Sequence, residues 1–160
     1  MQRRQFLRFG ALFATLGPIS FGLQAHHSQI VPVTYSREEW RQRLTRSQFK
    51  ILRDEGTERP FSSSLNNEKR QGVYHCAGCD LALFKSENKY DSGTGWPSFH
   101  TAITGHIETK PDKSLFYTRT EYHCARCGGH QGHVFDDGPK PTGLRWCNNG
   151  LALRFKPANP

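Results

Sequence analysis

The sequence has 160 residues, 35% of them hydrophobic and 22% charged, with a formal net charge of +8. This length is enough for one domain with a real hydrophobic core, and a mean hydropathy of −0.71 excludes a chain rich in membrane spans. Three arginines lie in the first eight residues, so the remaining 19 Lys and Arg against 14 Asp and Glu leave about +5. This modest excess favours solubility and does not indicate a nucleic-acid partner.

Residues 1–25 are typical of an export signal. A start that contains Arg3 and Arg4 is followed by an apolar run from Phe9 to about Leu23 and a small-residue end. The run is short for a membrane span, and adjacent arginines before Phe-Leu resemble a twin-arginine leader. We therefore expect export of a folded protein to the periplasm and no stable membrane insertion afterwards. The alternative is an anchoring N-terminal helix that is never cleaved.

The rest of the chain is expected to form one domain, residues 36–160, after a linker at 26–35. Ser36 and Glu39 form a capping-box pattern that predicts a helix, and a second helical stretch is predicted from Ser47 to about Glu55. Short β-prone runs follow at Val73–His75, Leu81–Phe84, His106–Glu108, Leu115–Arg119, His133–Phe135 and Leu144–Phe155. The pattern predicts a mainly β fold, an antiparallel sheet domain with a small N-terminal helical segment packed on it.

Four of the five cysteines form two Cys-x-x-Cys pairs, Cys76/Cys79 and Cys124/Cys127. Two cysteines on a tight turn can both bind one ion, and two such turns complete a tetrahedron. Folding before export would occur in a reducing compartment, which favours a structural zinc site. Two disulfides are the alternative. A catalytic zinc is disfavoured because four thiolates leave no open position.

The fifth cysteine, Cys147, stands alone in residues 144–155, which we expect to be one strand. With a period of two, Arg145, Cys147 and Asn149 project to the same face. A nearby cation lowers the pKa of a thiol, and the thiolate is the nucleophile. The alternative is a small cysteine buried in the core.

Two further segments carry residues suited to a catalytic site. His130 and His133 are three apart, a spacing that suits a metal ligand pair, a proton-transfer pair or structural histidines; with the cysteines on zinc, proton transfer is favoured. Asp136 and Asp137 are expected only to form a turn. In the Gly-rich loop before Pro97, the aromatic rings of Trp96 and Phe99 could either line an apolar pocket or lie in the core.

Together these segments resemble the methionine-R-sulfoxide reductase family. The matching residues are 95–99, 130–139 and 143–149, with further similarity at 57–61 and 72–74 and with both cysteine pairs where zinc-binding members carry them. The resemblance spans roughly residues 36–157. It implies two antiparallel β-sheets in a sandwich or barrel-like arrangement, with helices near the start.

The resemblance also implies roles for individual residues. Cys147 would attack the sulfoxide sulfur and become a sulfenic acid, with His133 and His130 supplying protons and Asn149 holding the oxygen or a water. Substrate binding is assigned to Trp96, Phe99 and Arg145. The substrate would be the R epimer, since each epimer needs its own enzyme, and we expect it within oxidised proteins.

Two positions depart from the family pattern. Thr94 stands where many members carry a resolving cysteine, and Gly150 stands where a serine is common. With four cysteines on zinc, oxidised Cys147 would need an external thiol, either a thioredoxin-like protein or a small thiol. We expect a monomer. The competing hypotheses are a zinc-stabilised binding module with a structural Cys147, and a general thiol-disulfide enzyme if zinc is absent.

Overall fold

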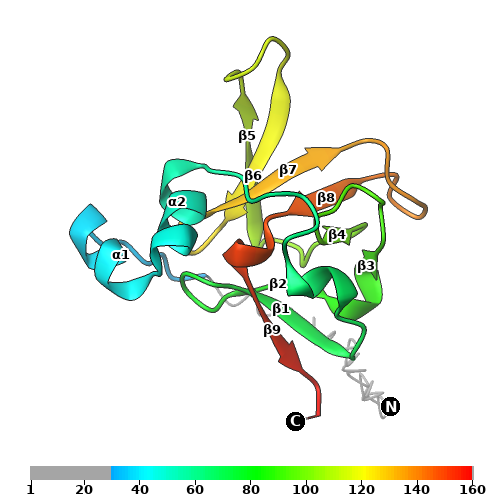
Figure 1. The fold of residues 1–160 in the computed structure, drawn as a ribbon, viewed down its shortest axis with the longest axis horizontal. Coiled ribbons are helices and arrows are strands. Elements are labelled where there is room, and N and C mark those ends of the chain that lie inside the picture. Colours follow the sequence, from blue (N-terminus) through cyan, green and yellow to red (C-terminus); the bar gives the residue numbers. More distant parts are fainter. Residues whose placement is uncertain (1–29, 160) are drawn as a thin grey trace, which may run out of the picture.

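The N-terminal part of the described chain forms two short helices, each opened by a capping box. The computed structural model describes residues 30–159 (Figure 1), so the expected signal peptide and the start of the linker lie outside the described residues. The helices are α1 (Arg37–Arg43) and α2 (Arg46–Asp54), with N-caps Ser36 and Thr45. The first helix ends at Arg43 and Thr45 caps the start of the second, so Phe49 lies on α2. None of the described helices is long and apolar enough to cross a membrane.

The remainder is β-structure with three short 3-10 turns, in agreement with the predicted fold class. The strands are β1 (Gly72–Cys76), β2 (Ala82–Lys85), β3 (Lys89–Tyr90), β4 (Ser98–Phe99), β5 (Ile107–Asp112), β6 (Arg119–Cys124), β7 (His130–Phe135), β8 (Arg145–Asn148) and β9 (Leu153–Pro157). The 3-10 turns are η1 (Ser64–Asn67), η2 (Ser86–Asn88) and η3 (Gly150–Ala152).

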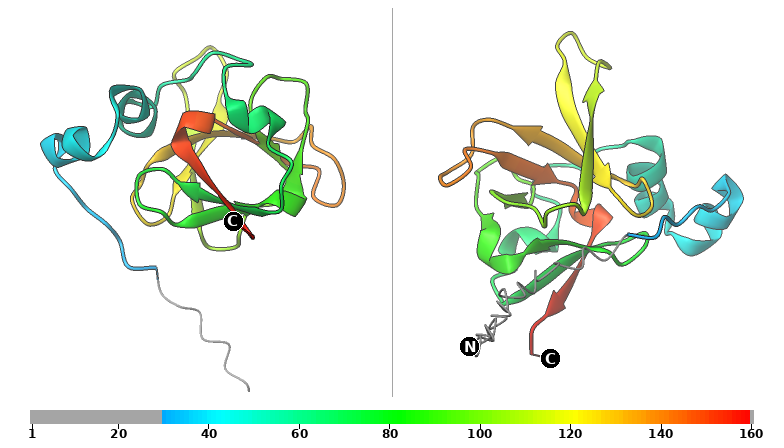
Figure 2. Two further views of the ribbon diagram at one scale, coloured as in Figure 1. Left: turned by 60° about the horizontal axis from the view of Figure 1, so that its bottom comes forward. Right: turned by 180° about the vertical axis from the view of Figure 1, so that it is seen from behind.

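Two antiparallel sheets enclose one core. The smaller sheet has the order β2-β1-β9 and the larger the order β3-β4-β8-β7-β6-β5; the left view of Figure 2 shows them curving around a common axis. Aromatic side chains fill the space between them: Tyr74, Phe84, Phe99 and Tyr122 are fully buried. Phe84 and Phe99 stack with ring centroids 4.2 Å apart. Such aromatic burial is the main apolar contribution to stability that the two sheets share.

The prediction of one strand over residues 144–155 is wrong. The segment divides into β8 in the larger sheet and β9 in the smaller one, with η3 between them. The break has a physical cause, since the backbone N–H groups of Gly150 and Leu151 donate to the carboxylate of Glu58 and not to a neighbouring strand. Asn149 consequently lies beyond the end of β8.

The strand predicted at Leu115–Arg119 is also misplaced. Its residues up to Thr118 belong to the turn between β5 and β6, and β6 begins only at Arg119. The carboxylate of Asp112 accepts a hydrogen bond from the Ser114 backbone at 2.9 Å, which turns the chain at the end of β5. The β-prone residues of this segment therefore lie in a turn and take no part in the sheet.

We expect Gly150→Ser to destabilise the protein, because a Cβ at this position would lie 1.9 Å from Ser63 Oγ and 3.2 Å from Glu58 Oε1. Overpacking of this kind costs about 1–3 kcal/mol. The free energy of unfolding should recover in part when Ser63→Gly is added, and denaturant titration of both single variants and the double variant would measure this. Equal destabilisation by Gly150→Ser in both backgrounds would contradict the steric explanation.

Candidate functional site

Cys147 lies at the centre of the larger sheet, on β8 between β4 and β7. The register pairs Cys147 with Ser98 on one side and with His133 on the other. Residues directly opposite each other in antiparallel strands project to the same face, so the sheet itself brings the thiol and the imidazole together. The sequence identified both residues, and their common face follows from the pairing of β7 with β8.

A pocket of about 120 Å³ opens above this pair of strands. Its lining consists of Thr57, Trp96, Arg119, Gly132, His133, Phe135, Cys147, Asn148 and Asn149. Pockets that bind drug-sized ligands or cofactors typically measure about 300–1,000 Å³. A pocket of this size suits one side chain or a similarly small group, with an aromatic wall beside a thiol and an imidazole.

The surroundings of Cys147 favour the protonated thiol. Burial raises its pKa above the ordinary value, while the Arg145 guanidinium and the Thr94 hydroxyl oppose that effect. Arg145 is held by two hydrogen bonds to the Asp137 carboxylate, at 2.7 and 2.8 Å. The sequence assigned Asp137 only to a turn, yet it pairs with the cation that we expected to activate the thiol, and its charge opposes part of the effect of Arg145 on the Cys147 pKa.

His133 is uncharged at neutral pH. Its Nε2 lies 2.8 Å from a carboxylate oxygen of Asp112, which also accepts a hydrogen bond from Arg119 at 2.6 Å. Burial lowers the pKa of His133, whereas the Asp112 hydrogen bond raises it. Asp112 therefore fixes the ring orientation and would stabilise the imidazolium. Neither Asp112 nor Arg119 stands out in the sequence, because both reach the site only through the β5–β6 hairpin.

His130 lies behind His133 and does not line the pocket. Its side chain is 2% exposed, and its Nδ1 is 2.7 Å from Glu121. The two histidine rings have centroids 5.6 Å apart, so His130 reaches the pocket only through His133.

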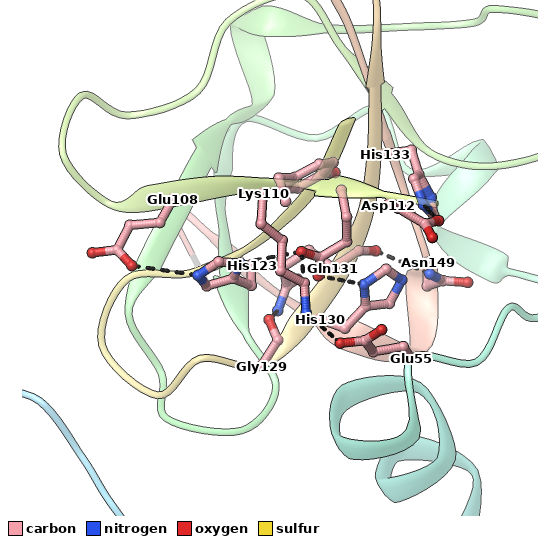
Figure 3. A network of polar contacts seen from close by, with 12 residues as sticks. Glu55, Glu108, Lys110, Asp112, His123, Gly129, His130, Gln131, His133 and Asn149 are labelled. Carbon is pink, nitrogen blue, oxygen red and sulfur yellow. Dashed lines mark hydrogen bonds and ion pairs between the residues drawn. The ribbon is translucent and has the colours of Figure 1, made fainter. Parts of the chain in front are cut away.

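A buried acid anchors His130 within a larger polar network, shown in Figure 3. Burial alone would raise the pKa of Glu121, but hydrogen bonds with His123 and His130 lower it to about 2. His123 continues the network to Glu108 at 3.3 Å, and Lys110 lies near Glu121 at 3.9 Å. Glu121 is therefore ionised over the neutral pH range and holds the ring of His130 in place.

Asn149 lines the pocket, but both ends of its amide already have backbone partners. Its Nδ2 donates to the Gln131 carbonyl, and its Oδ1 accepts from the Glu58 N–H, each at 3.0 Å. These bonds fix the chain where it leaves β8. In this structure the Asn149 side chain connects the backbone of Glu58 to the backbone of Gln131. Its predicted contact with a substrate oxygen stays a prediction.

Glu58 is the residue that sequence reasoning passed over, although it lies in one of the segments that carried the family resemblance. Its carboxylate binds the start of η3, and its backbone carbonyl accepts a hydrogen bond from Trp96 Nε1 at 3.1 Å. Glu58 is 9% exposed. One buried acid thus fixes both the end of β8 and the orientation of the indole in the pocket wall.

Phe99 does not occupy the position that we expected for it. It is fully buried in the aromatic core, and the aromatic wall of the pocket is completed by Phe135. The physical reason is that Phe99 alternates with Ser98 along β4, so the two side chains point to opposite faces. Arg145 packs its guanidinium 4.2 Å from the centroid of the Phe135 ring and lies outside the lining.

The four remaining cysteines form a cluster that fits one metal ion. Their sulfur atoms all lie within 4.8 Å of one another, with Cys76 and Cys127 3.7 Å apart and Cys79 and Cys124 3.5 Å apart. All five cysteines carry free thiols. A tetrahedral site with metal–sulfur distances of about 2.3 Å requires sulfur–sulfur distances of about 3.8 Å. The donor set and spacing therefore suit a closed four-thiolate metal site.

This cluster joins the two sheets. Cys76 ends β1 and Cys79 lies on the turn to β2 in the smaller sheet, while Cys124 ends β6 and Cys127 lies on the turn to β7 in the larger one. Loss of one ligand should therefore be costly to the whole fold.

We expect Cys124→Ser to lose the bound metal and to lower the free energy of unfolding by several kcal/mol, since structural metal binding contributes directly to folding. Elemental analysis should find one metal ion per wild-type chain, and denaturant titration would measure the loss of stability. The matched control is Cys147→Ser, which should keep the metal. Equal metal content in the wild type and Cys124→Ser would contradict this assignment.

Asp112→Asn should lower the pKa of His133 by roughly 1 unit, because the imidazolium loses its anionic partner while Arg119 remains. Titration of the histidine ring resonances by NMR would measure the shift. Asp137→Asn removes the other carboxylate near the site and should leave the His133 pKa nearly unchanged. A rise in the His133 pKa on substitution of Asp112 would contradict the stabilisation of the imidazolium by this carboxylate.

Comparison with known proteins agrees with this geometry. Residues 44–157 match the SelR domain. The chain is 52% identical over 125 residues to peptide methionine sulfoxide reductase MsrB of Methanosarcina barkeri, covering 78% of this chain and 88% of that protein. It is 55% identical over 122 residues to the MsrB of Pseudomonas putida, covering 75% and 91%. It is also 52% identical over 120 residues to the chloroplastic peptide methionine sulfoxide reductase B1 of Oryza sativa, covering 74% of this chain and 56% of that one. The chain belongs to the SelR domain family.

Proposed function

We propose that this protein is an oxidoreductase that reduces the R epimer of methionine sulfoxide in oxidised proteins, with Cys147 as the nucleophile. Membership of the SelR family and identities near 50% to peptide methionine sulfoxide reductases support the reaction. The observation that carries the assignment of residues is the placement of the Cys147 thiol and the His133 ring on one small pocket with Trp96.

The thiol and the imidazole are both neutral before substrate arrives, and this defines the first step. As the sulfur of Cys147 attacks the sulfoxide sulfur, its proton passes to His133, and the imidazolium is stabilised by Asp112. His133 then delivers the proton to the sulfoxide oxygen, which weakens the S–O bond. Positioned proton transfer of this kind contributes about 10²–10⁴-fold to a rate.

The step balances as an oxygen transfer. The attack breaks the S–H bond of Cys147 and forms a bond between the two sulfur atoms. The protonated oxygen then passes from the methionine sulfur to the Cys147 sulfur, so the S–O bond of the sulfoxide and the S–S bond both break. Methionine leaves as the reduced thioether, and Cys147 is oxidised by two electrons to the sulfenic acid. The pocket gives this reaction an orientation, because Trp96 and Phe135 offer an apolar wall to the methyl group. His133 offers the proton on a different side. Only one configuration at sulfur can place its methyl on the aromatic wall and its oxygen toward His133.

Recycling requires an external thiol in this proposal. Cys147 has Thr94 nearby in place of a second redox cysteine, and the other four cysteines form the metal cluster. An external thiol attacks the sulfenic sulfur, releasing water and forming a mixed disulfide. A second thiol then attacks that disulfide, returning Cys147 as a thiol and leaving an external disulfide. A thioredoxin-like protein and a small thiol both fit this chemistry.

Three further properties belong to the same proposal. The metal is zinc, because four cysteines with tetrahedral spacing are its typical structural ligands. The protein is exported by its twin-arginine-type leader and acts in the periplasm, a hypothesis supported by the sequence of residues 1–25. It acts as a monomer.

The decisive experiment separates the two epimers. Purified mature protein should reduce a chromophore-labelled methionine-R-sulfoxide in excess dithiothreitol and leave the S epimer unchanged. Cys147→Ser should lower the rate by at least about 10³-fold, since it removes the nucleophile, while keeping the fold and the metal. Reduction of neither epimer by folded, metal-loaded protein would refute the proposal and favour a binding module.

A further inference from the structure

The tip of the β5–β6 hairpin exposes three large apolar side chains in a row. Leu115 is 47% exposed, Tyr117 62%, and Phe116 is exposed as fully as in an extended peptide. Figure 1 shows this hairpin projecting away from the body of the molecule. Contiguous apolar groups on a projecting turn contribute nothing to the core and typically mark an interaction site.

The tip is continuous with the pocket. Arg119 lines the pocket and is paired at 2.6 Å with Asp112, directly opposite it in the last pair of the ladder before the turn. Leu115 is three residues beyond Asp112, so it lies at most about 10 Å farther along the chain. A polypeptide with one side chain in the pocket therefore carries its neighbouring residues to the tip within about three positions.

A second exposed aromatic side chain packs on Gly95, the residue before Trp96. Phe61 is 74% exposed and has a positive φ of 61°. Its backbone N–H donates to the carbonyl of Gly95 at 2.7 Å, and its ring packs so closely that a Cβ on Gly95 would lie 2.9 Å from it. A bulky residue in this conformation costs of order 1–3 kcal/mol, so the neighbouring structure holds the ring near Trp96 against strain.

The pocket itself cannot hold more than one side chain, so the rest of a polypeptide substrate must lie on the surface around it. Methionine is usually buried in folded proteins among other apolar residues. A buried methionine and the apolar residues around it become accessible when the substrate is unfolded or locally opened. An apolar surface beside a small pocket suits a substrate of this kind.

We propose that the Leu115–Tyr117 tip binds apolar residues that flank methionine sulfoxide in an extended polypeptide, with Phe61 as a second contact. The inference rests on the proposed function and specifies its substrate class. It predicts selection by sequence context: an enzyme that recognises only the oxidised side chain would reduce all peptides equally, whereas this surface would favour those with apolar neighbours.

The test compares two peptides that contain methionine-R-sulfoxide, one flanked by Leu and Phe and the other by Gly and Ser, together with N-acetyl-methionine-R-sulfoxide. The triple variant Leu115→Ser, Phe116→Ser, Tyr117→Ser should lower kcat/KM for the apolar peptide about fivefold, corresponding to roughly 1 kcal/mol of lost contact. Its kcat/KM for the other two substrates should change by less than about twofold. The decrease in kcat/KM should come mainly from a higher KM.

Val31→Ser is the matched control, because Val31 is a similarly exposed apolar residue, at 75%, and does not line the pocket. It should leave all three substrates unaffected. Unchanged reduction of the small substrate by the triple variant establishes that the fold and the chemistry survive.

Three outcomes would overturn the inference. The first is an equal rate for both peptides with the wild type, and the second is an equal loss on all three substrates in the triple variant. The third is unchanged peptide kinetics while the same substitutions abolish binding to lipid vesicles or dissociate a dimer, which would assign the tip to a membrane or to a second copy. Failure of the wild type to reduce any of the three substrates refutes the proposed function instead.

Discussion

The four-cysteine cluster is the constraint on which the rest of the structure depends. It joins the β1–β2 turn to the β6–β7 turn, and these turns belong to different sheets. The cluster is connected to the pocket by Gln131, whose Nε2 donates a hydrogen bond to Cys76 Sγ at 3.4 Å. The carbonyl of the same residue accepts hydrogen bonds from the backbone and the side chain of Asn149. A single buried residue thus connects the metal cluster to the end of the strand that carries the nucleophile.

The charges around the pocket are paired with one another, and burial of the two reacting groups favours their neutral forms. Arg145 binds Asp137 and Arg119 binds Asp112, while burial raises the pKa of Cys147 and lowers that of His133. A thiolate waiting in an open pocket would be exposed to oxidants at all times. In the proposed cycle the nucleophile forms only when a sulfoxide oxygen is present to take the proton, so the same burial that slows spontaneous oxidation still allows the reaction.

The sequence predicted those features that depend on local pattern. The Cys-x-x-Cys pairs, the Ser36 capping box and the motifs containing His133 and Cys147 are visible within a few residues, and the two-sheet class followed from the family resemblance. Features that depend on distant contacts were missed. Glu58 is 92 residues from the Gly150 N–H that it binds, and that contact is what breaks the strand expected at 144–155. Asp112 is likewise 21 residues from His133. An apolar, β-prone composition could not show that residues 115–117 face solvent, since the same composition suits a buried strand.

The position of Thr94 has a consequence for how the site is used. Its hydroxyl lies 2.8 Å from Ser92 Oγ, which in turn lies 2.7 Å from Ser98 Oγ, so a chain of hydroxyl groups lies where many family members place a redox-active cysteine. In the proposed cycle an oxidised Cys147 must then be reached from outside through the same opening that admitted the substrate. Methionine must leave before the reductant can enter, because a pocket of about 120 Å³ holds only one group at a time. The two half-reactions therefore alternate in the proposed cycle, because the external thiol in the second consumes the sulfenic acid formed in the first.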